Sequence, residues 1–187
     1  MIASASPAEK LRLRDGLTVS VRTVTPDDED ALWEFLTGLS IDSRRLRFFG
    51  VATNLRAQAH LGAAGDDPDH HGVLATVPGR GTVGHAAYVR VPSSERAEVA
   101  VVVADDLHHL GLATLLLIRL AQSGEDRAIS RFFAEVLSEN RDMLAVFRDG
   151  FAAVTVIGRD VIEVEFPTQS WRAAHARFGA QAAARSG

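Results

Sequence analysis

A valine-rich run that passes through a glycine turn into a leucine-rich run constrains this chain more than any other feature. Residues 97–104 are mostly apolar and include four β-branched valines, and they predict a strand. Residues 115–120 predict a helix, with a stop at Ser123-Gly124. Gly111 and Ala113 keep side chains away from the expected helix N-terminus, where free backbone amides bind anions. The segment therefore predicts a site for a ligand that carries a phosphate.

A second strand–helix unit follows. Residues 129–137 predict a strand, Ser138 is a plausible N-cap, and apolar side chains then recur at helical spacing. Those side chains are Met143, Leu144 and Phe147. Gly150 is expected to end this helix, and Phe151 is expected to begin the next strand.

The remaining elements complete an α/β pattern. A strand is expected at residues 17–24, helices at 25–39, 43–49, 54–64 and 169–185, and hairpins at 72–91 and 151–166. Their order predicts one domain with a central mixed, mostly antiparallel sheet, helices on both faces and a C-terminal helix. We expect a flexible N-terminal tail at 1–15, the domain at 16–168 and a C-terminal helical extension at 169–187.

Composition excludes several classes of protein. With 187 residues, 47% of them hydrophobic, the chain suits a single domain with a sizeable core. A net charge of −4 without a basic block argues against nucleic-acid binding. Without cysteine there is no disulfide, thiolate metal site or cysteine nucleophile. No signal-peptide core or bilayer-spanning run of about 20 apolar residues is seen, so we expect a cytoplasmic protein that does not bind membranes.

Two motifs resemble the GNAT family of N-acetyltransferases. The acyl-CoA loop of that family, Gln/Arg-x-x-Gly-x-Gly/Ala, is similar to residues 108–113. Its later helix, which starts at an asparagine and runs to Gly-Phe, is similar to residues 140–151, one residue short before Gly150-Phe151. Residues 19–28 are similar to its first strand and helix start, and the resemblance extends over residues 16–168.

The resemblance implies that acetyl-CoA is the co-substrate. The loop at 109–114 would offer backbone amides to the pyrophosphate, and residues 101–103 would offer main-chain groups to the pantetheine and the thioester. The resemblance assigns to cofactor binding Val101, Val102, Val103, His108, His109, Leu110, Gly111, Leu112, Ala113, Thr114, Asn140 and Phe147. An alternative for Asn140 is simple helix capping.

The sequence departs from the family at two positions. His108 stands where Gln or Arg is usual, which brings less charge than Arg and weakens phosphate binding without abolishing it. Phe147 stands where many members have a tyrosine that protonates the leaving thiolate. A thiol with a pKa of about 8.5 leaves as thiolate without an acid.

Glu98 is the candidate general base. It opens an otherwise apolar strand, on the face of Val102 and Ala104, and apolar walls would strengthen it as a base. In the protein acetyltransferases that this chain resembles, a glutamate at the matching place has that role. The alternative is a surface salt bridge to Arg96. His85 is a weaker candidate, because a lone strand histidine is more often structural.

Other polar clusters are expected to be structural. His70 and His71 lie beside three aspartates, but adjacent histidines in an extended chain point apart, so no metal site is predicted. Arg44, Arg45 and Arg47 are interpreted mainly as a solvated helical face, with contact to an acidic acceptor or to CoA as the alternative.

The leading prediction is an acetyl-CoA-dependent N-acetyltransferase that acts on a primary amine by direct attack. A protein lysine is favoured as acceptor because residues 39–49 are similar to a stretch of bacterial protein-lysine acetyltransferases. A small-molecule amine stays open. The rivals are a non-catalytic acyl-CoA sensor or scaffold and an interaction module built on the helix of Trp171 and Phe178. The oligomeric state, including a homodimer, is left open.

Overall fold

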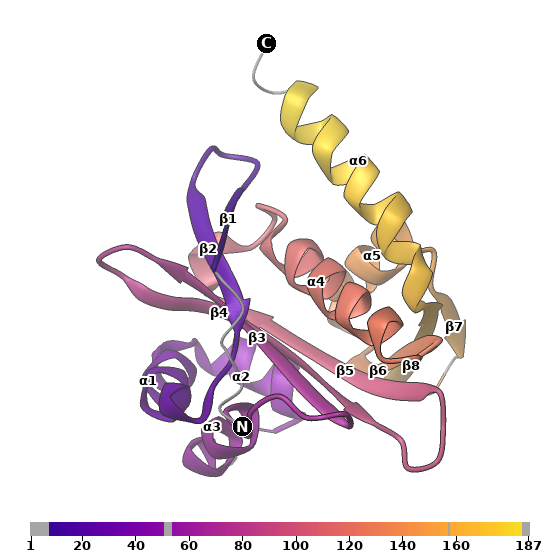
Figure 1. The fold of residues 1–187 in the computed structure, drawn as a ribbon, viewed down its shortest axis with the longest axis horizontal. Helices are drawn as coiled ribbons and strands as arrows, with labels where there is room; N and C mark the ends of the chain where they lie inside the picture. The colour runs from indigo at the N-terminus through magenta and orange to yellow at the C-terminus, as the bar shows by residue number, and fades with distance from the viewer. Residues whose placement is uncertain (1–7, 51–53, 157, 185–187) are drawn as a thin grey trace.

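The computed structural model describes residues 8–50, 54–156 and 158–184. Eight strands form one sheet in the order β1-β2-β3-β4-β5-β6-β8-β7, and every neighbouring pair is antiparallel except β5 and β6. Helices α1–α3 lie on one side of the sheet, and α4 with α6 lies on the other (Figure 1). The expected α/β fold is confirmed.

The bounds of the elements follow the sequence closely. The strands are β1 (Glu9–Arg12), β2 (Thr18–Thr23), β3 (His70–Val77), β4 (Gly81–Arg90), β5 (Arg96–Val103), β6 (Arg131–Leu137), β7 (Val154–Val156) and β8 (Val161–Pro167). The helices are α1 (Glu29–Gly38), α2 (Ile41–Phe48), α3 (Leu55–Gly62), α4 (Leu112–Asp126), α5 (Arg141–Ala145) and α6 (Trp171–Ala184). A π-helical turn at Val146–Gly150 continues α5.

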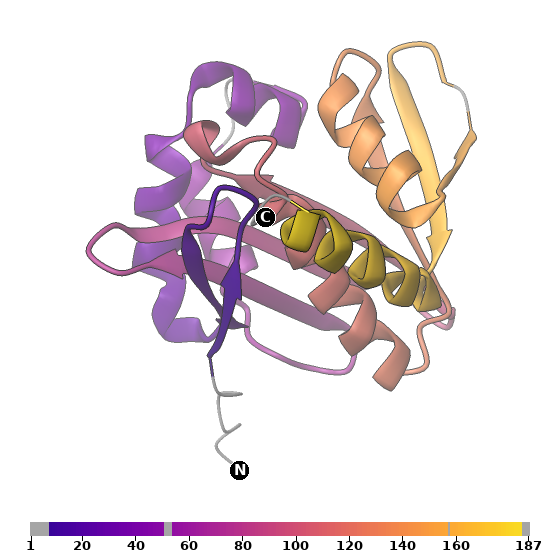
Figure 2. The same ribbon diagram turned by 90° about the horizontal axis from the view of Figure 1, so that it is seen from above.

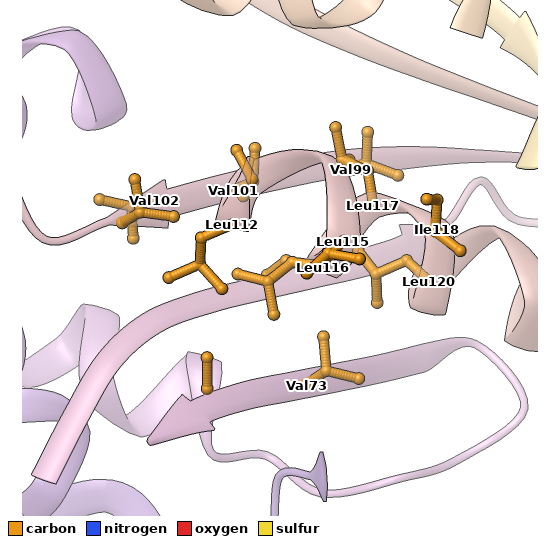
Figure 3. Close-up of a cluster of buried hydrophobic side chains, with 14 of the residues drawn as sticks. Val73, Val99, Val101, Val102, Leu112, Leu115, Leu116, Leu117, Ile118 and Leu120 are labelled. Atoms are coloured by element: carbon orange, nitrogen blue, oxygen red, sulfur yellow. The ribbon is translucent and has the colours of Figure 1, made fainter. Parts of the chain in front are cut away.

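The main core lies between α4 and the sheet (Figure 3). Nine residues of the helix are buried, because its leucines repeat around most of its circumference. They pack on Val99 and Val101, which share one face of β5, and on Val73 of β3. Burying each such side chain contributes about 1.5–3 kcal/mol, which fixes α4 and its N-terminus relative to the end of β5.

The sheet opens where β5 and β6 meet. These parallel strands pair only between Arg96–Glu98 and Arg131–Phe133. Beyond this point β6, β8 and α5 turn away from the rest of the sheet (Figure 2). The edge of residues 99–103 that faces away from β4 is thus left without a strand partner in the described sheet. Its free N–H and C=O groups need partners from elsewhere.

The prediction of a flexible N-terminal tail at residues 1–15 is wrong from Glu9 onward. Glu9–Arg12 pair with β2 as strand β1, since Leu11 packs against the core and Leu13 is buried. Residues 1–7 lie outside the described residues. The C-terminal extension forms α6 up to Ala184, and positions 185–187 lie outside the described residues as well.

Three local boundaries also differ from expectation. Helix α4 runs through Ser123-Gly124 to Asp126, because Gly124 serves close packing: a Cβ there would lie 2.7 Å from the ring of Phe132. Asn140, not Ser138, caps α5. Phe151 is buried in the core before β7 begins at Val154. None of the described helices is long and apolar enough to cross a membrane.

Candidate active site

A cavity of about 380 Å³ lies at the end of β5, beside the N-terminus of α4. Helices α2, α5 and α6 supply its other walls. Nine of the expected cofactor-binding residues line it: Val102, Val103, His108, His109, Gly111, Leu112, Ala113, Thr114 and Asn140. Val101, Leu110 and Phe147 do not belong to its lining. Val101 is buried beneath α4, and its expected main-chain role depends on the open strand edge.

Gly111 shapes the turn at the cavity. It is the N-cap of α4 with φ +89°, in the left-handed region that other residues adopt only with strain. A Cβ at this position would lie 2.4 Å from Cε2 of Phe178 on α6. The turn therefore admits only glycine without movement, and the first amides of α4 stay uncovered by a side chain at that position.

The two acids upstream of the turn are bound elsewhere. Asp105 accepts hydrogen bonds from Ser40 (Oγ, 2.6 Å) and Ser43 (Oγ, 2.5 Å). Burial acts to raise the pKa of Asp105, but these bonds outweigh it and lower the pKa to about 2. Asp106 is bound by Arg80 at 2.8 Å, which lowers the pKa of its carboxyl group. Both carboxylates therefore stay ionised close to the expected phosphate site, Asp106 paired with a cation and Asp105 hydrogen-bonded by serine hydroxyls.

Two cations that the sequence analysis missed border the cavity. Arg14 comes from the turn between β1 and β2, and Arg177 comes from α6. The Arg14 guanidinium lies 5.9 Å above the ring of Phe178, and Nη1 donates to the carbonyl oxygen of His109 at 3.4 Å. Arg177 donates to the carbonyl oxygen of Asp149. Nothing local in the sequence marks these residues, because they meet only in the fold.

Asn140 and Phe147 have different surroundings. Asn140 lines the cavity, and its Oδ1 accepts a hydrogen bond from the backbone of Met143 at 3.2 Å. The capping alternative is therefore observed, while its amide nitrogen is not used in that bond. Phe147 is 1% exposed, with its ring 5.7 Å from that of Phe166. Its side chain belongs to the core, so it offers no group to the cavity.

Glu98 lies at the last paired position before β5 and β6 separate. Its side chain is exposed on the sheet face shared with Val102. The apolar walls that the sequence analysis expected around Glu98 are therefore not present in the part of the chain that the structure describes. The alternative ion pair with Arg96 is not seen among the described residues, where Arg96 instead pairs with Glu165 at 2.9 Å and Glu163 at 3.6 Å. Glu98 thus stands at the point of the opening with its carboxylate accessible.

His85 and Arg47 lie on the same side of the sheet as Glu98. His85 pairs with Val102 across β4 and β5 and is 6% exposed. Burial, assisted by the charge of Arg47, lowers its pKa to about 3, so the ring is neutral at pH 7. Arg47 of α2 lines the cavity, and burial lowers its pKa to about 10 against the opposing effect of Glu98. The arginine therefore remains charged.

The histidine pair at the start of β3 has separate partners. Nδ1 of His70 lies 2.9 Å from the carbonyl oxygen of Gly65, and Nδ1 of His71 lies 2.7 Å from Oδ1 of Asp66. Burial lowers the pKa of His71. Within the described parts of the chain, no three potential metal-ligating side chains are grouped.

Comparisons with known proteins identify the family and the fold. A family model described as the acetyltransferase (GNAT) family matches residues 33–151. The GNAT domain of S. lividans PAT is 33% identical over 86% of this chain and 96% of that domain, with a TM-score of 0.76.

Two more distant structures share the fold. A cAMP-binding acyltransferase from Mycobacterium smegmatis is 23% identical, with a TM-score of 0.61; the match covers 94% of this chain but 56% of that protein. Spermidine N-acetyltransferase from Vibrio cholerae, solved with CoA and spermine, is 13% identical over 82% of this chain and 98% of that one, with a TM-score of 0.63. The family match, which covers more than half of the chain, and the 33% identity show that this protein belongs to the GNAT acetyltransferase family.

Proposed function

We propose that this protein transfers an acetyl group from acetyl-CoA to a primary amine, and that the acceptor is a protein lysine. The observation that carries the proposal is the strand edge of residues 99–103, which lies between Glu98 and the cavity that Val102 and Val103 line. The edge has no strand partner in the described sheet; it begins beside the exposed Glu98, where β5 and β6 separate, and ends at the cavity next to the N-terminus of α4. A thioester acyl transfer needs a held donor, a base and stabilisation of negative charge.

The cavity suits the polar end of acetyl-CoA. The first amides of α4 are free of intrahelical partners and point toward a bound anion. Arg14 and Arg177 add two positive charges to the lining, which offset the weaker charge of His108. The strand edge at residues 99–103 supplies main-chain groups for the pantetheine arm, in the manner of an added strand.

The chemistry requires only proton removal and charge stabilisation. The amine nitrogen attacks the thioester carbon, the carbon–sulfur bond breaks, and the sulfur leaves with the bonding electrons as thiolate. Before attack the ammonium gives one proton to Glu98, directly or through a water molecule, and the nitrogen loses its second proton to solvent as the amide forms. The thiolate is stable enough to leave without an acid, so the phenylalanine at position 147 does not prevent turnover.

Helix α2, which forms part of the cavity wall, favours a protein lysine as the acceptor. Helix α2, whose sequence resembles bacterial protein-lysine acetyltransferases, borders the cavity through Ser43, Leu46 and Arg47. The identity to S. lividans PAT supports the same choice. The exposed Glu98 leaves room for a lysine presented on the surface of another protein, whereas an enclosed pocket would favour a small amine.

Glu98→Gln tests the role of the base. This change keeps the shape of the side chain and removes proton acceptance, so kcat should fall by about 10²–10⁴ while the Kd for CoA stays unchanged. Turnover is measured by release of free thiol, across a panel of amines and lysine-bearing proteins. Glu98→Asp should retain part of the activity, because the carboxylate is displaced by one methylene but kept.

Glu34→Gln is the matched control, since Glu34 is exposed on α1 and has no assigned role in the site. It should leave kcat at the parent value. Full turnover of Glu98→Gln at every pH would remove Glu98 from the mechanism. Binding of acetyl-CoA by the parent without turnover on any acceptor would support the sensor instead.

A further inference from the structure

Arg47 is an arginine with unused hydrogen-bond donors beside the opening of the sheet. It borders the cavity with Val102 and Val103. Its Nε is buried without a hydrogen-bond partner in the described part of the chain, and no ion pair of its guanidinium is found there. A buried N–H donor normally has a partner, because an unpaired donor in the protein interior loses its hydrogen bond to water without replacement. Such an arrangement points to a negatively charged partner that arrives with the substrate.

The surroundings hold Arg47 in place without neutralising it. Its guanidinium lies 4.8 Å from the ring of Phe48. The N-terminus of α2 is tied to the loop after β5, since Ser43 donates to Asp105 at 2.5 Å. The neighbouring His85 is uncharged at neutral pH, and its Nε2 also lacks a partner within the described residues. The cation is therefore positioned by packing and by the helix, and none of the described residues accepts a hydrogen bond from its buried Nε.

Its location matches the place where negative charge develops. Arg47 acts electrostatically on His85, which pairs with Val102, and on Glu98 at the start of the opening. Val102 belongs to the strand edge that is assigned above to the pantetheine arm and, at residues 101–103, to the thioester. Phe147 is buried among aromatic rings, so the cavity has no hydroxyl at that position to assist the leaving sulfur.

We propose that Arg47 is a catalytic residue, donating N–H groups to the charge that builds on the thioester as its carbon–sulfur bond breaks. This inference rests on the proposed acetyl transfer. Arg47 stays protonated throughout: Glu98 takes one proton from the ammonium before attack, and solvent takes the second proton of the nitrogen. The electron pair of the carbon–sulfur bond goes to sulfur, and the arginine stabilises the resulting thiolate through hydrogen bonds. Charge stabilisation by Arg47 thereby replaces the proton that a tyrosine would donate.

Arg47→Gln tests this role by separating turnover from binding. We expect kcat to fall about 10²-fold, the usual effect of losing one donor to a developing charge, while the Kd for CoA measured by calorimetry changes less than about twofold. Arg47→Lys should recover part of the loss, because it keeps the charge but not the forked donor geometry. Arg44→Gln on the same helix, outside the cavity lining, is the matched control and should keep the parent kcat.

Rescue by an added cation separates chemistry from folding. Arg47→Ala should regain activity when guanidine hydrochloride is added at non-denaturing concentration, and sodium chloride at equal ionic strength should not restore it. If the parent is active and the Arg47 variants keep full activity, or if guanidine does not rescue Arg47→Ala, the inference is overturned and the proposed function is not. Loss confined to the Kd for CoA also overturns it, because Arg47 would then be a phosphate-binding residue. A parent without turnover overturns both this inference and the proposed function.

Discussion

At the scale of single residues, the site depends on positions where one atom decides the geometry. Gly111 combines a positive φ with contact to a ring from a distant helix. Gly124 combines a helical backbone with contact to Phe132. In both cases the missing Cβ allows two elements to approach, so the glycine is required by the neighbour as well as by its own backbone.

Gly111→Ala should lower the free energy of unfolding by about 2–4 kcal/mol, from left-handed strain together with overpacking against Phe178. In a Phe178→Leu background the ring atoms nearest to the new Cβ are gone, so the same change should cost only the strain, about 1–2 kcal/mol. Urea denaturation of the four proteins in this cycle measures the difference. Equal costs in the two backgrounds would show that Phe178 does not limit position 111.

At the scale of elements, helix α2 is held over the end of β5 by one carboxylate. Asp105 accepts bonds from the backbone N–H of Ser40 at 3.0 Å and from the hydroxyls of Ser40 and Ser43. These bonds link the N-terminus of α2 to the loop that leads into α4. The position of Arg47 therefore depends on a contact made at the opposite end of its helix.

The stabilisation from Asp105 should disappear in acid. The pKa of its carboxyl is lowered on folding to about 2, below the unfolded value of about 3.9, so the contribution is complete above pH 4 and is lost as pH falls through about 2. The difference in unfolding free energy between the parent and Asp105→Asn should therefore shrink between pH 4 and 2. Chemical denaturation at pH 7, 4 and 2 measures it.

Asp126→Asn provides the comparison, since Asp126 is exposed at the end of α4, away from the contact with α2. Its difference from the parent should stay small at each of the three pH values. If the difference between the parent and Asp105→Asn were constant from pH 7 to pH 2, the hydrogen-bonded carboxylate would be contradicted.

At the scale of the whole molecule, the cavity is assembled from segments that are distant in sequence. The β1–β2 turn, α2, the end of β5, α5 and α6 each supply part of its lining. A ligand that fills it contacts elements from near both ends of the described chain. Binding should therefore stabilise the domain against global unfolding, because the unfolded chain has no such site.

Free CoA at about 100 times its Kd should raise the unfolding free energy by about 2.7 kcal/mol, which corresponds to a rise of about 5–10 °C in Tm. Gly111→Asp places a carboxylate at the expected pyrophosphate site and should weaken CoA binding at least tenfold. This variant should therefore need at least ten times more CoA than the parent for the same rise in Tm. Gly179→Asp on α6, where an added Cβ meets nothing within 4 Å, should keep the parent response. Equal responses of the two variants would place CoA elsewhere.

The sequence alone determined the strand–turn–helix unit, the mixed sheet and nine of the residues that line the cavity. These features are local: alternation and helical periodicity reveal which faces are buried, and Gly111 marks the turn within a few residues of the strand and helix it joins. The capping of α5 by Asn140 was available from the same local information, as the alternative to a ligand contact.

Only the tertiary structure decided which distant side chains share the site. Arg14, Arg47 and Arg177 reach one cavity because the β1–β2 turn, α2 and α6 converge there, and no spacing within the sequence encodes that meeting. It also placed Phe147 in the core and left Glu98 exposed at the opening of the sheet. Periodicity assigns a residue to one face of its own element, but what covers that face depends on packing with the rest of the chain.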